Sequence, residues 1–180
     1  ELLAGMMETV EDIPKHAILN GLAWDWEEYG GYLDSLDRCQ PAINVAGLVG
    51  HCAVRFYVMG ERAVEEQASE AEKKQMAEIV GRAIDCGAVG FSTNRYPPHV
   101  LPDGRSIPGT YADSDELLQI AEVVGARNGL MQNVLDFSKL EFTTKLLKEI
   151  ARASGSRVLF SFGVSPERQS GVRAAAYVEE

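Results

Sequence analysis

Several features that mark particular protein classes are scarce in this sequence. Its three cysteines, Cys39, Cys52 and Cys86, form no Cys-x-x-Cys pair, which argues against a disulfide scaffold and a structural zinc module. The most apolar stretch, residues 45–50, is far shorter than the roughly 20 residues that a helix needs to cross a bilayer. Nothing resembles a signal peptide. We therefore expect a soluble, cytoplasmic protein with no membrane partner.

Positive charge is also scarce. The 180 residues include 17 Lys and Arg against 27 Asp and Glu, which gives a formal net charge of −10. No cluster of basic residues with interleaved aromatic ones interrupts this balance. Because such a field repels phosphate backbones, nucleic acid is excluded as a partner.

The two ends of the sequence predict a piece taken from inside a longer protein. The chain begins at Glu1 instead of a methionine, and it ends on residues 178–180, which are helical in character. At 180 residues the chain is still long enough to bury a core of its own, since single domains of this size are ordinary.

Two segments follow from the pattern of apolar residues. Residues 1–40 are expected to be a helical lead-in, because apolar side chains recur there at the spacing of an amphipathic helix. These side chains are Trp26, Tyr29, Leu33 and Leu36. Residues 41–180 alternate short apolar runs with amphipathic ones, which predicts four strand–helix units. The predicted strands are 42–50, 88–93, 129–134 and 157–164, and the predicted helix starts are Ser69 with Glu72, Ser114, Ser138 with Glu141, and Ser170.

This alternation predicts an α/β fold with parallel strands, either a (β/α) barrel or a doubly wound sheet. No glycine-rich phosphate loop follows any predicted strand, which favours the barrel. The expected fold is therefore a partial (β/α) TIM-type barrel with about four βα units. Because four units are half of a complete barrel, the open sheet edges make self-association possible.

Several motifs in the sequence resemble, in the same order, those of the N-acyl-D-amino-acid deacylases, or D-aminoacylases, of the amidohydrolase superfamily. The resemblance extends from the first residues to about Gln132 and weakens after it. The matching positions are 6–14, 24–26, 32–34, 44–51, 58–63, 90–95, 99, 103–104 and 108–112. Each motif is weak alone, but their order makes the set specific.

The resemblance implies a zinc hydrolase on a distorted (β/α)8 barrel, in which metal-activated hydroxide attacks the acyl carbonyl of an N-acyl-D-amino acid. In that family the ligands come from an early His-x-His, an Asn-Cys-Gly turn, two later histidines and a late Asp. The first two motifs are absent here. Where the two histidines are expected, the sequence has Met131-Gln132-Asn133 and Phe160-Ser161-Phe162. We therefore expect zinc in the full-length protein, none held by this piece, and catalytic groups outside it.

Six residues are candidates for substrate binding: His51, Arg55, Arg95, His99, Tyr111 and Gln132. His51 directly follows a predicted strand, where barrels place their chemistry, although a neutral His that orders a neighbouring loop is an equal alternative. Arg55 has the geometry to pair with a substrate carboxylate or with an acidic side chain of the protein, the second being favoured.

The other four candidates lie further along the chain. Residues 93–112 form a loop too long to be a simple connector, which predicts a substrate lid or wall that includes Arg95, His99 and Tyr111. The resemblance implies substrate contact at Tyr111. The Gln132 amide suits orienting substrate, and it equally suits a buried and satisfied hydrogen-bonding role.

The function predicted from the sequence is removal of the acyl group from N-acyl-D-amino acids by the full-length protein, with the isolated chain inactive. One alternative is a cyclic-amide hydrolase of the same superfamily, related to dihydroorotase or hydantoinase. The other is a non-catalytic acidic α/β module that associates with itself or with a partner.

Overall fold

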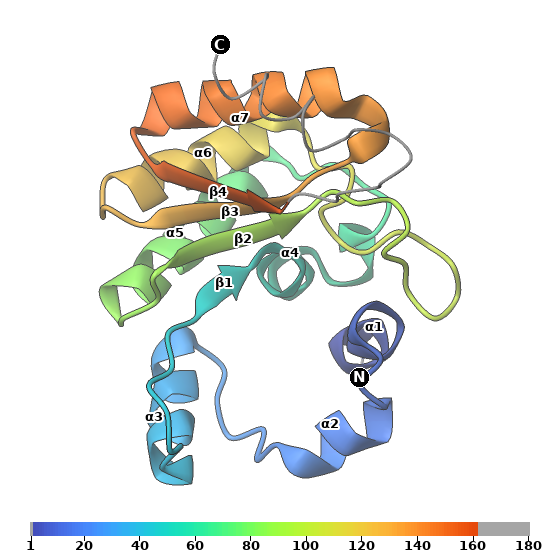
Figure 1. Ribbon diagram of the computed structural model, residues 1–180, viewed down its shortest axis with the longest axis vertical. Coiled ribbons are helices and arrows are strands. Elements are labelled where there is room, and N and C mark those ends of the chain that lie inside the picture. The colour runs from blue at the N-terminus through green and yellow to red at the C-terminus, as the bar shows by residue number, and fades with distance from the viewer. Residues whose placement is uncertain (1, 162–180) are drawn as a thin grey trace.

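The computed structural model describes residues 2–161 of the chain. Within them, four strands form one parallel sheet whose spatial order, β1-β2-β3-β4, is also their order along the sequence (Figure 1). The strands are β1 (Leu48–Gly50), β2 (Gly90–Asn94), β3 (Leu130–Val134) and β4 (Arg157–Ser161). The prediction of an α/β fold with parallel strands is confirmed.

The helices that follow the strands pack on one face of this sheet and enclose the core (Figure 1). They are α4 (His51–Met59), α5 (Glu70–Asp85), α6 (Ser114–Gly125) and α7 (Leu140–Ser154), with short 3-10 turns η1 (Gly60–Ala63) and η2 (Phe137–Lys139). Four side chains from one row of the sheet enter this core: Val49, Phe91, Met131 and Val158. Because side chains alternate along a strand, the next row faces away from the helices.

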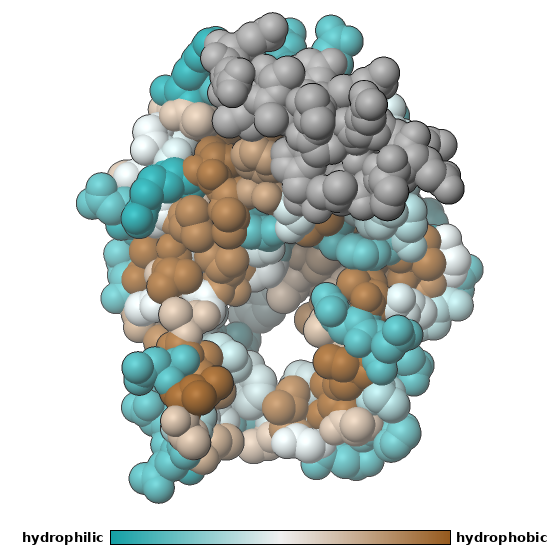
Figure 2. Space-filling model, in the orientation of Figure 1, coloured by the Kyte–Doolittle hydropathy of each residue, from teal (hydrophilic) through white to brown (hydrophobic). Residues whose placement is uncertain are grey.

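The first 40 residues form three helices that arch beside β1 (Figure 1). These are α1 (Leu2–Glu11), α2 (Lys15–Gly21) and α3 (Tyr29–Cys39). The space-filling view shows a hollow inside this arch, bordered partly by apolar residues (Figure 2). The Thr9 hydroxyl of α1 donates a hydrogen bond to the carbonyl of Val100, so α1 contacts the loop between β2 and α6.

The first strand–helix unit differs from the prediction. The strand expected over 42–50 is formed only at Leu48–Gly50, and residues 41–46 are exposed, Ile43 to 75%. Helix α4 begins immediately at His51, whereas the first helix had been predicted to begin only after Ser69. The run of apolar and β-branched residues suited a strand locally, but within the described residues only its last three pair with β2.

The helix boundaries were predicted unevenly. Ser69 and Glu72 form the expected capping box at the start of α5, and α6 begins at Ser114 as predicted. The predicted cap at Ser138 is wrong. Asp136 accepts hydrogen bonds from the Ser138 backbone and hydroxyl, which places Ser138 in η2 and starts α7 two residues later.

Two further expectations concern the ends of the chain. Trp26 precedes the helix it was expected to join, since α3 begins at Tyr29. Residues 162–164 of the fourth predicted strand and the helix predicted from Ser170 lie outside the described residues.

None of the helices between residues 2 and 161 combines the length and apolar character that crossing a bilayer requires.

Candidate functional site

A row of polar side chains lies on the sheet face opposite the helices. The register places Ser92 of β2 beside Gln132 of β3. The Ser92 hydroxyl donates to the Gln132 side-chain oxygen, and Gln132 Nε2 donates to the Ser161 hydroxyl of β4 at 3.4 Å. We call Ser92, Gln132 and Ser161 the polar row. Ser92 and Gln132 lie at the middle of their strands, and Ser161 is the last residue of β4. Parallel α/β folds place their ligands beyond the carboxyl ends of such strands.

Asn94 and His99 extend this polar surface at the end of β2. Asn94 shares the strand face of Ser92, because the two residues are two positions apart. Its Nδ2 lies 2.5 Å from His99 Nδ1, and its Oδ1 accepts a hydrogen bond from the Tyr96 backbone N–H at 3.0 Å. The Tyr96 ring meets the imidazole edge-on, with 5.1 Å between centroids. Both Asn94 and His99 are half-buried.

A second polar cluster is buried on the helix side of β2. His51 Nδ1 lies 2.9 Å from the Thr93 hydroxyl and His51 Nε2 lies 2.6 Å from Glu116 Oε1 of α6. The other oxygen of Glu116 accepts a hydrogen bond from Arg55 Nη1. The three charged or titratable residues are at most 2% exposed. The cluster therefore joins α4, β2 and α6 inside the core.

Burial and pairing set the charges of this cluster. Desolvation lowers the pKa of His51, and the carboxylate of Glu116 offsets that effect only in part. Burial acts to raise the pKa of Glu116, but the hydrogen bonds from His51 and Arg55 and the positive charge of Arg55 outweigh it, and the pKa is lowered. At neutral pH His51 is therefore neutral, donating from Nε2 to an ionised Glu116 and accepting from Thr93 at Nδ1.

Each of the three nitrogens of the Arg55 guanidinium donates a hydrogen bond within the protein. Besides Glu116, it donates from Nε to the Ala63 carbonyl at 3.0 Å and from Nη2 to the Glu66 carbonyl. Of the two roles considered for Arg55, the geometry matches the internal ion pair. A direct contact of Arg55 or His51 with substrate stays a prediction.

The loop of residues 95–113, which joins β2 to α6, packs closely on the buried cluster. Gly109 has φ +93°, and a Cβ there would lie 2.6 Å from His51 Nδ1. Only glycine fits both the backbone conformation and the space. His51 thus supports the backbone of the loop from below, which agrees with the loop-ordering alternative for this residue.

Two more predicted site residues belong to the end of this loop. Arg95 Nη1 donates to the Ala112 carbonyl at 2.8 Å, and burial lowers the pKa of this guanidinium. The Tyr111 carbonyl accepts from Gln67 Nε2 at 2.9 Å, while the side chain of Tyr111 is 55% exposed. Arg95 therefore ties the loop together, and substrate contact by Arg95 or Tyr111 stays a prediction.

The residues present do not fit a zinc site. Between residues 2 and 161, no three His, Cys, Asp or Glu side chains gather closely enough to hold a metal ion. Both nitrogens of His51 are engaged by Thr93 and Glu116. The neighbouring Cys52 is mostly buried, and this desolvation raises the pKa of its thiol to about 11. Cys52 is consequently a poor ligand and a poor nucleophile at neutral pH.

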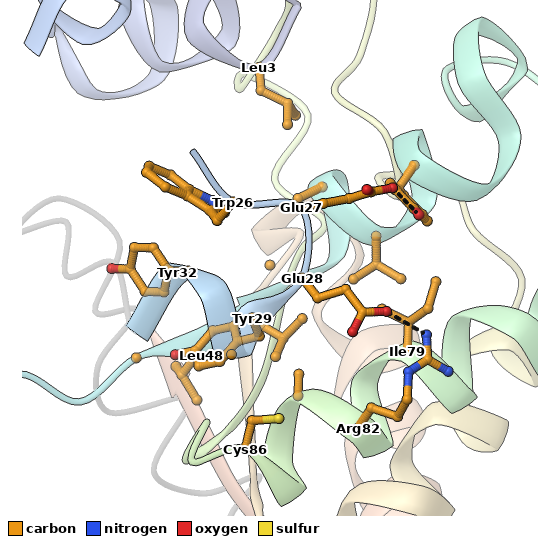
Figure 3. A pocket seen from close by; sticks show the side chains of 18 of the residues that line it. Leu3, Trp26, Glu27, Glu28, Tyr29, Tyr32, Leu48, Ile79, Arg82 and Cys86 are labelled. Atoms are coloured by element: carbon orange, nitrogen blue, oxygen red, sulfur yellow. Dashed lines mark hydrogen bonds and ion pairs between the residues drawn. The ribbon is translucent and has the colours of Figure 1, made fainter. Parts of the chain in front are cut away.

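A separate cavity of about 480 Å³ lies between α3, β1, α4 and α5. Aromatic side chains line it together with an ion pair between Glu28 and Arg82 (Figure 3). The buried Tyr29 hydroxyl has no hydrogen-bond partner within the described part of the chain. None of the six predicted site residues lines this cavity, so it is distinct from the polar row.

Sequence reasoning predicted Gln132 but missed Glu116 and the two serines of the polar row, Ser92 and Ser161. Glu116 carried a signal, because it occupies the same helical stripe as the buried Ile120 and Val124. A charged residue at a core position requires a buried partner. The pairing of Ser92 with Ser161 through Gln132 had no local signal, since it depends on the register of three strands.

Comparison with known proteins bears on the chain as a whole. No family model matches it. It is 26% identical over 128 residues to a D-aminoacylase of Alcaligenes xylosoxydans xylosoxydans, covering 71% of this chain and 24% of the relative. It is 37% identical over 100 residues to an N-acyl-D-glutamate deacylase of the same organism, covering 55% and 18%. The chain thus spans a quarter or less of the length of these relatives.

A solved structure has the same fold. The N-acyl-D-glutamate deacylase of Bordetella bronchiseptica, in complex with zinc and a phosphonate inhibitor, matches 84% of this chain and 32% of its own length, with a TM-score of 0.63 and 24% identity. The resemblance inferred from the ordered motifs is confirmed by these relatives.

Proposed function

We propose that this chain, a relative of the N-acyl-D-amino-acid deacylases, is part of a hydrolase that cleaves the amide bond between an acyl group and a D-amino acid. The observation that carries the proposal is the match of most of the chain to D-aminoacylase in sequence and to a deacylase in fold. The polar row supplies hydrogen-bonding groups on the sheet face away from the helices, and the Asn94–His99 pair supplies them at the carboxyl end of β2. Such groups suit a small polar substrate.

We also propose that the sheet is half of a (β/α)8 barrel, with residues 41–180 as its four units and residues 1–40 as a lead-in. In a doubly wound sheet the strand order reverses and helices cover both faces. Here the order follows the sequence and α4–α7 lie on one face. That arrangement supports the barrel, in which the polar row would face the interior.

Zinc and the catalytic groups would then come from residues outside the described part of this chain. The Bordetella relative was solved with zinc, and the side chains described here do not form such a site. Within this chain, Gln132 and His99 are the candidates whose polar atoms lie on the sheet face away from the helices. They would bind and orient substrate.

The test is a substrate panel on the full-length protein that contains these 180 residues. We expect hydrolysis of linear N-acetyl-D-amino acids, and we include N-acetyl-D-glutamate, -aspartate and -methionine because the side-chain preference is open. Preferential hydrolysis of dihydroorotate or hydantoins would assign the protein to the cyclic-amide hydrolases instead.

Elemental analysis of the same protein separates the hydrolase from the non-catalytic module. A stoichiometric metal ion, removed by chelator together with activity and restored with zinc, is the expected result. A metal-free protein that hydrolyses nothing in the panel and associates with itself or with another protein would favour the module.

A further inference from the structure

We propose that His99 is a substrate-binding residue that presents a fixed Nε2–H donor, and that Asn94 is the positioning residue that fixes it. The ligand is a hydrogen-bond-accepting oxygen of an N-acyl amino acid, in its carboxylate or its acyl carbonyl. The substrate class rests on the proposed function, whereas the tautomer of His99 follows from the geometry of β2 and the loop after it.

The Asn94 side chain has only one orientation that satisfies its neighbours. Its Oδ1 accepts the backbone N–H of Tyr96 at 3.0 Å, so the atom directed at the imidazole is Nδ2. An amide nitrogen can only donate. His99 Nδ1, 2.5 Å away, must therefore be the acceptor, and the hydrogen of the neutral ring is on Nε2.

The orientation of the His99 ring is fixed as well as its tautomer. The His99 backbone N–H donates to the Tyr96 carbonyl at 3.0 Å, which closes a turn, and the Tyr96 ring contacts the imidazole edge-on. Within residues 2–161, Nε2 makes no hydrogen bond to the protein. The donor is thus fixed before any ligand arrives, which lowers the entropy cost of binding.

The position of the pair directs it to the same surface as the polar row. Asn94 and Ser92 share one face of β2, and Ser92 bonds to Gln132. Arg95, one residue later, lies on the opposite face and is held by the Ala112 carbonyl. Because side chains alternate along a strand, Asn94 faces the same side as the polar row and Arg95 faces the helices. His99, which is bonded to Asn94, is therefore the group at this strand end that can contact a ligand on that side.

The tautomer can be read directly in the full-length protein labelled with 15N-histidine. Loss of one signal set in His99→Gln assigns His99, and we expect an unprotonated Nδ1 and a protonated Nε2. The variant Asn94→Asp keeps an oxygen that accepts from the Tyr96 backbone but replaces the amide nitrogen that faces the His99 ring with a second oxygen. We expect Nδ1 of His99 to become protonated in this variant. A protonated Nδ1 in the unaltered protein overturns the proposal.

Binding is tested by adding N-acetyl-D-glutamate and by comparing two variants. A glutamine amide can place an N–H near the position of Nε2, whereas an asparagine amide reaches only the position of Nδ1. We expect the ligand to shift the Nε2 resonance, and KM in His99→Asn to exceed that in His99→Gln by about tenfold, the loss of one hydrogen bond to an anion. A fall in kcat of His99→Asn at unchanged KM would show that Nε2 bonds to the acyl carbonyl oxygen of the substrate and not to its carboxylate.

His16→Gln, at an exposed position, is the control and leaves KM unchanged. Equal KM and kcat in His99→Asn and His99→Gln, or a ligand that does not move Nε2, contradicts the proposal. Absence of turnover in the unaltered protein would reject the proposed function alone, since the resonance and its response to the ligand still decide the role of His99.

Discussion

Glu116 is the residue on which the buried cluster depends. It is fully buried and bonds both His51 and Arg55. Glu116→Gln keeps the volume but leaves the Arg55 charge without its counter-charge, and removing one partner of a buried pair typically costs about 3–5 kcal/mol. We expect urea denaturation, followed by circular dichroism, to show a loss of about 3 kcal/mol in the free energy of unfolding.

Glu122 provides the matched control, because it lies exposed on the same helix. Glu122→Gln is expected to change stability by no more than about 0.5 kcal/mol. Equal effects of the two substitutions would show that Glu116 and Arg55 do not depend on each other.

His51 makes stability depend on pH. Burial lowers its pKa in the folded state, so the unfolded chain binds a proton more readily, with a pKa near 6.5. Stability is therefore complete above about pH 6.5 and is lost as pH falls below it. Between pH 7.5 and 5.5 the loss from this residue is on the order of 1 kcal/mol.

The comparison of His51→Gln with the unaltered protein isolates this dependence. The variant is less stable at pH 7.5 but lacks that part of the pH slope, whereas His16→Gln, at an exposed side chain, retains it. An unchanged slope in His51→Gln would mean that the pKa of His51 is the same in the folded and the unfolded protein, which contradicts the lowering by burial.

Residue roles were only partly predictable from the sequence. The position of His51 after a strand and the length of the 93–112 loop indicated where the polar groups gather. Which of them face a ligand depends on strand parity, since Arg95 and Asn94 are neighbours in sequence but lie on opposite faces of β2. β2 begins at Gly90, two residues later than the predicted start at Ala88, and this shift does not alter the parity.

At the scale of elements, α5 is stabilised by its capping box. The Ser69 hydroxyl accepts from the Glu72 backbone, and Glu72 accepts from the Ser69 backbone. These bonds, with Arg62, lower the pKa of Glu72 to about 2. Ser69→Ala should reduce the free energy of unfolding by about 1 kcal/mol, the typical value of an N-cap.

Ser114 is the suitable control, since it is the first residue of α6 and its cap is Asp113. Ser114→Ala is expected to be nearly neutral when both variants are compared by urea denaturation followed by circular dichroism. A larger loss at Ser114 than at Ser69 would contradict the assignment of both caps.

Elements with a local signal were predicted well. The capping box of α5 and the apolar stripe of α6 are encoded within a few residues, and both agree with the structure. The strand predicted over 42–50 was too long, because a strand forms only where another strand pairs with it. That partner lies far away in the sequence, so the local pattern does not reveal how many residues pair. Helix α7 begins later than predicted because Asp136 accepts hydrogen bonds from the backbone and hydroxyl of Ser138, which therefore lies in η2 and does not cap α7.

At the scale of the whole molecule, β1 and β4 each have one neighbour within the described sheet. Free edges of parallel strands invite further pairing. We propose that the isolated 180-residue chain self-associates, which analytical ultracentrifugation at increasing concentration would detect. A monodisperse monomer at every concentration would contradict this prediction.

The isolated chain is also expected to be inactive. Its described residues lack a metal site. Metal-dependent hydrolysis of N-acetyl-D-amino acids by the 180 residues alone, with zinc added, would reject this expectation.

The most direct test of the proposed function is the stereochemical preference of the full-length protein. We predict that kcat/KM for an N-acetyl-D-amino acid exceeds that for its L-enantiomer by at least about a hundredfold, because a site that hydrogen-bonds one enantiomer leaves polar groups unpaired with the other. Equal hydrolysis of the two enantiomers, or hydrolysis of neither across the panel, would contradict the assignment to the D-amino-acid deacylases.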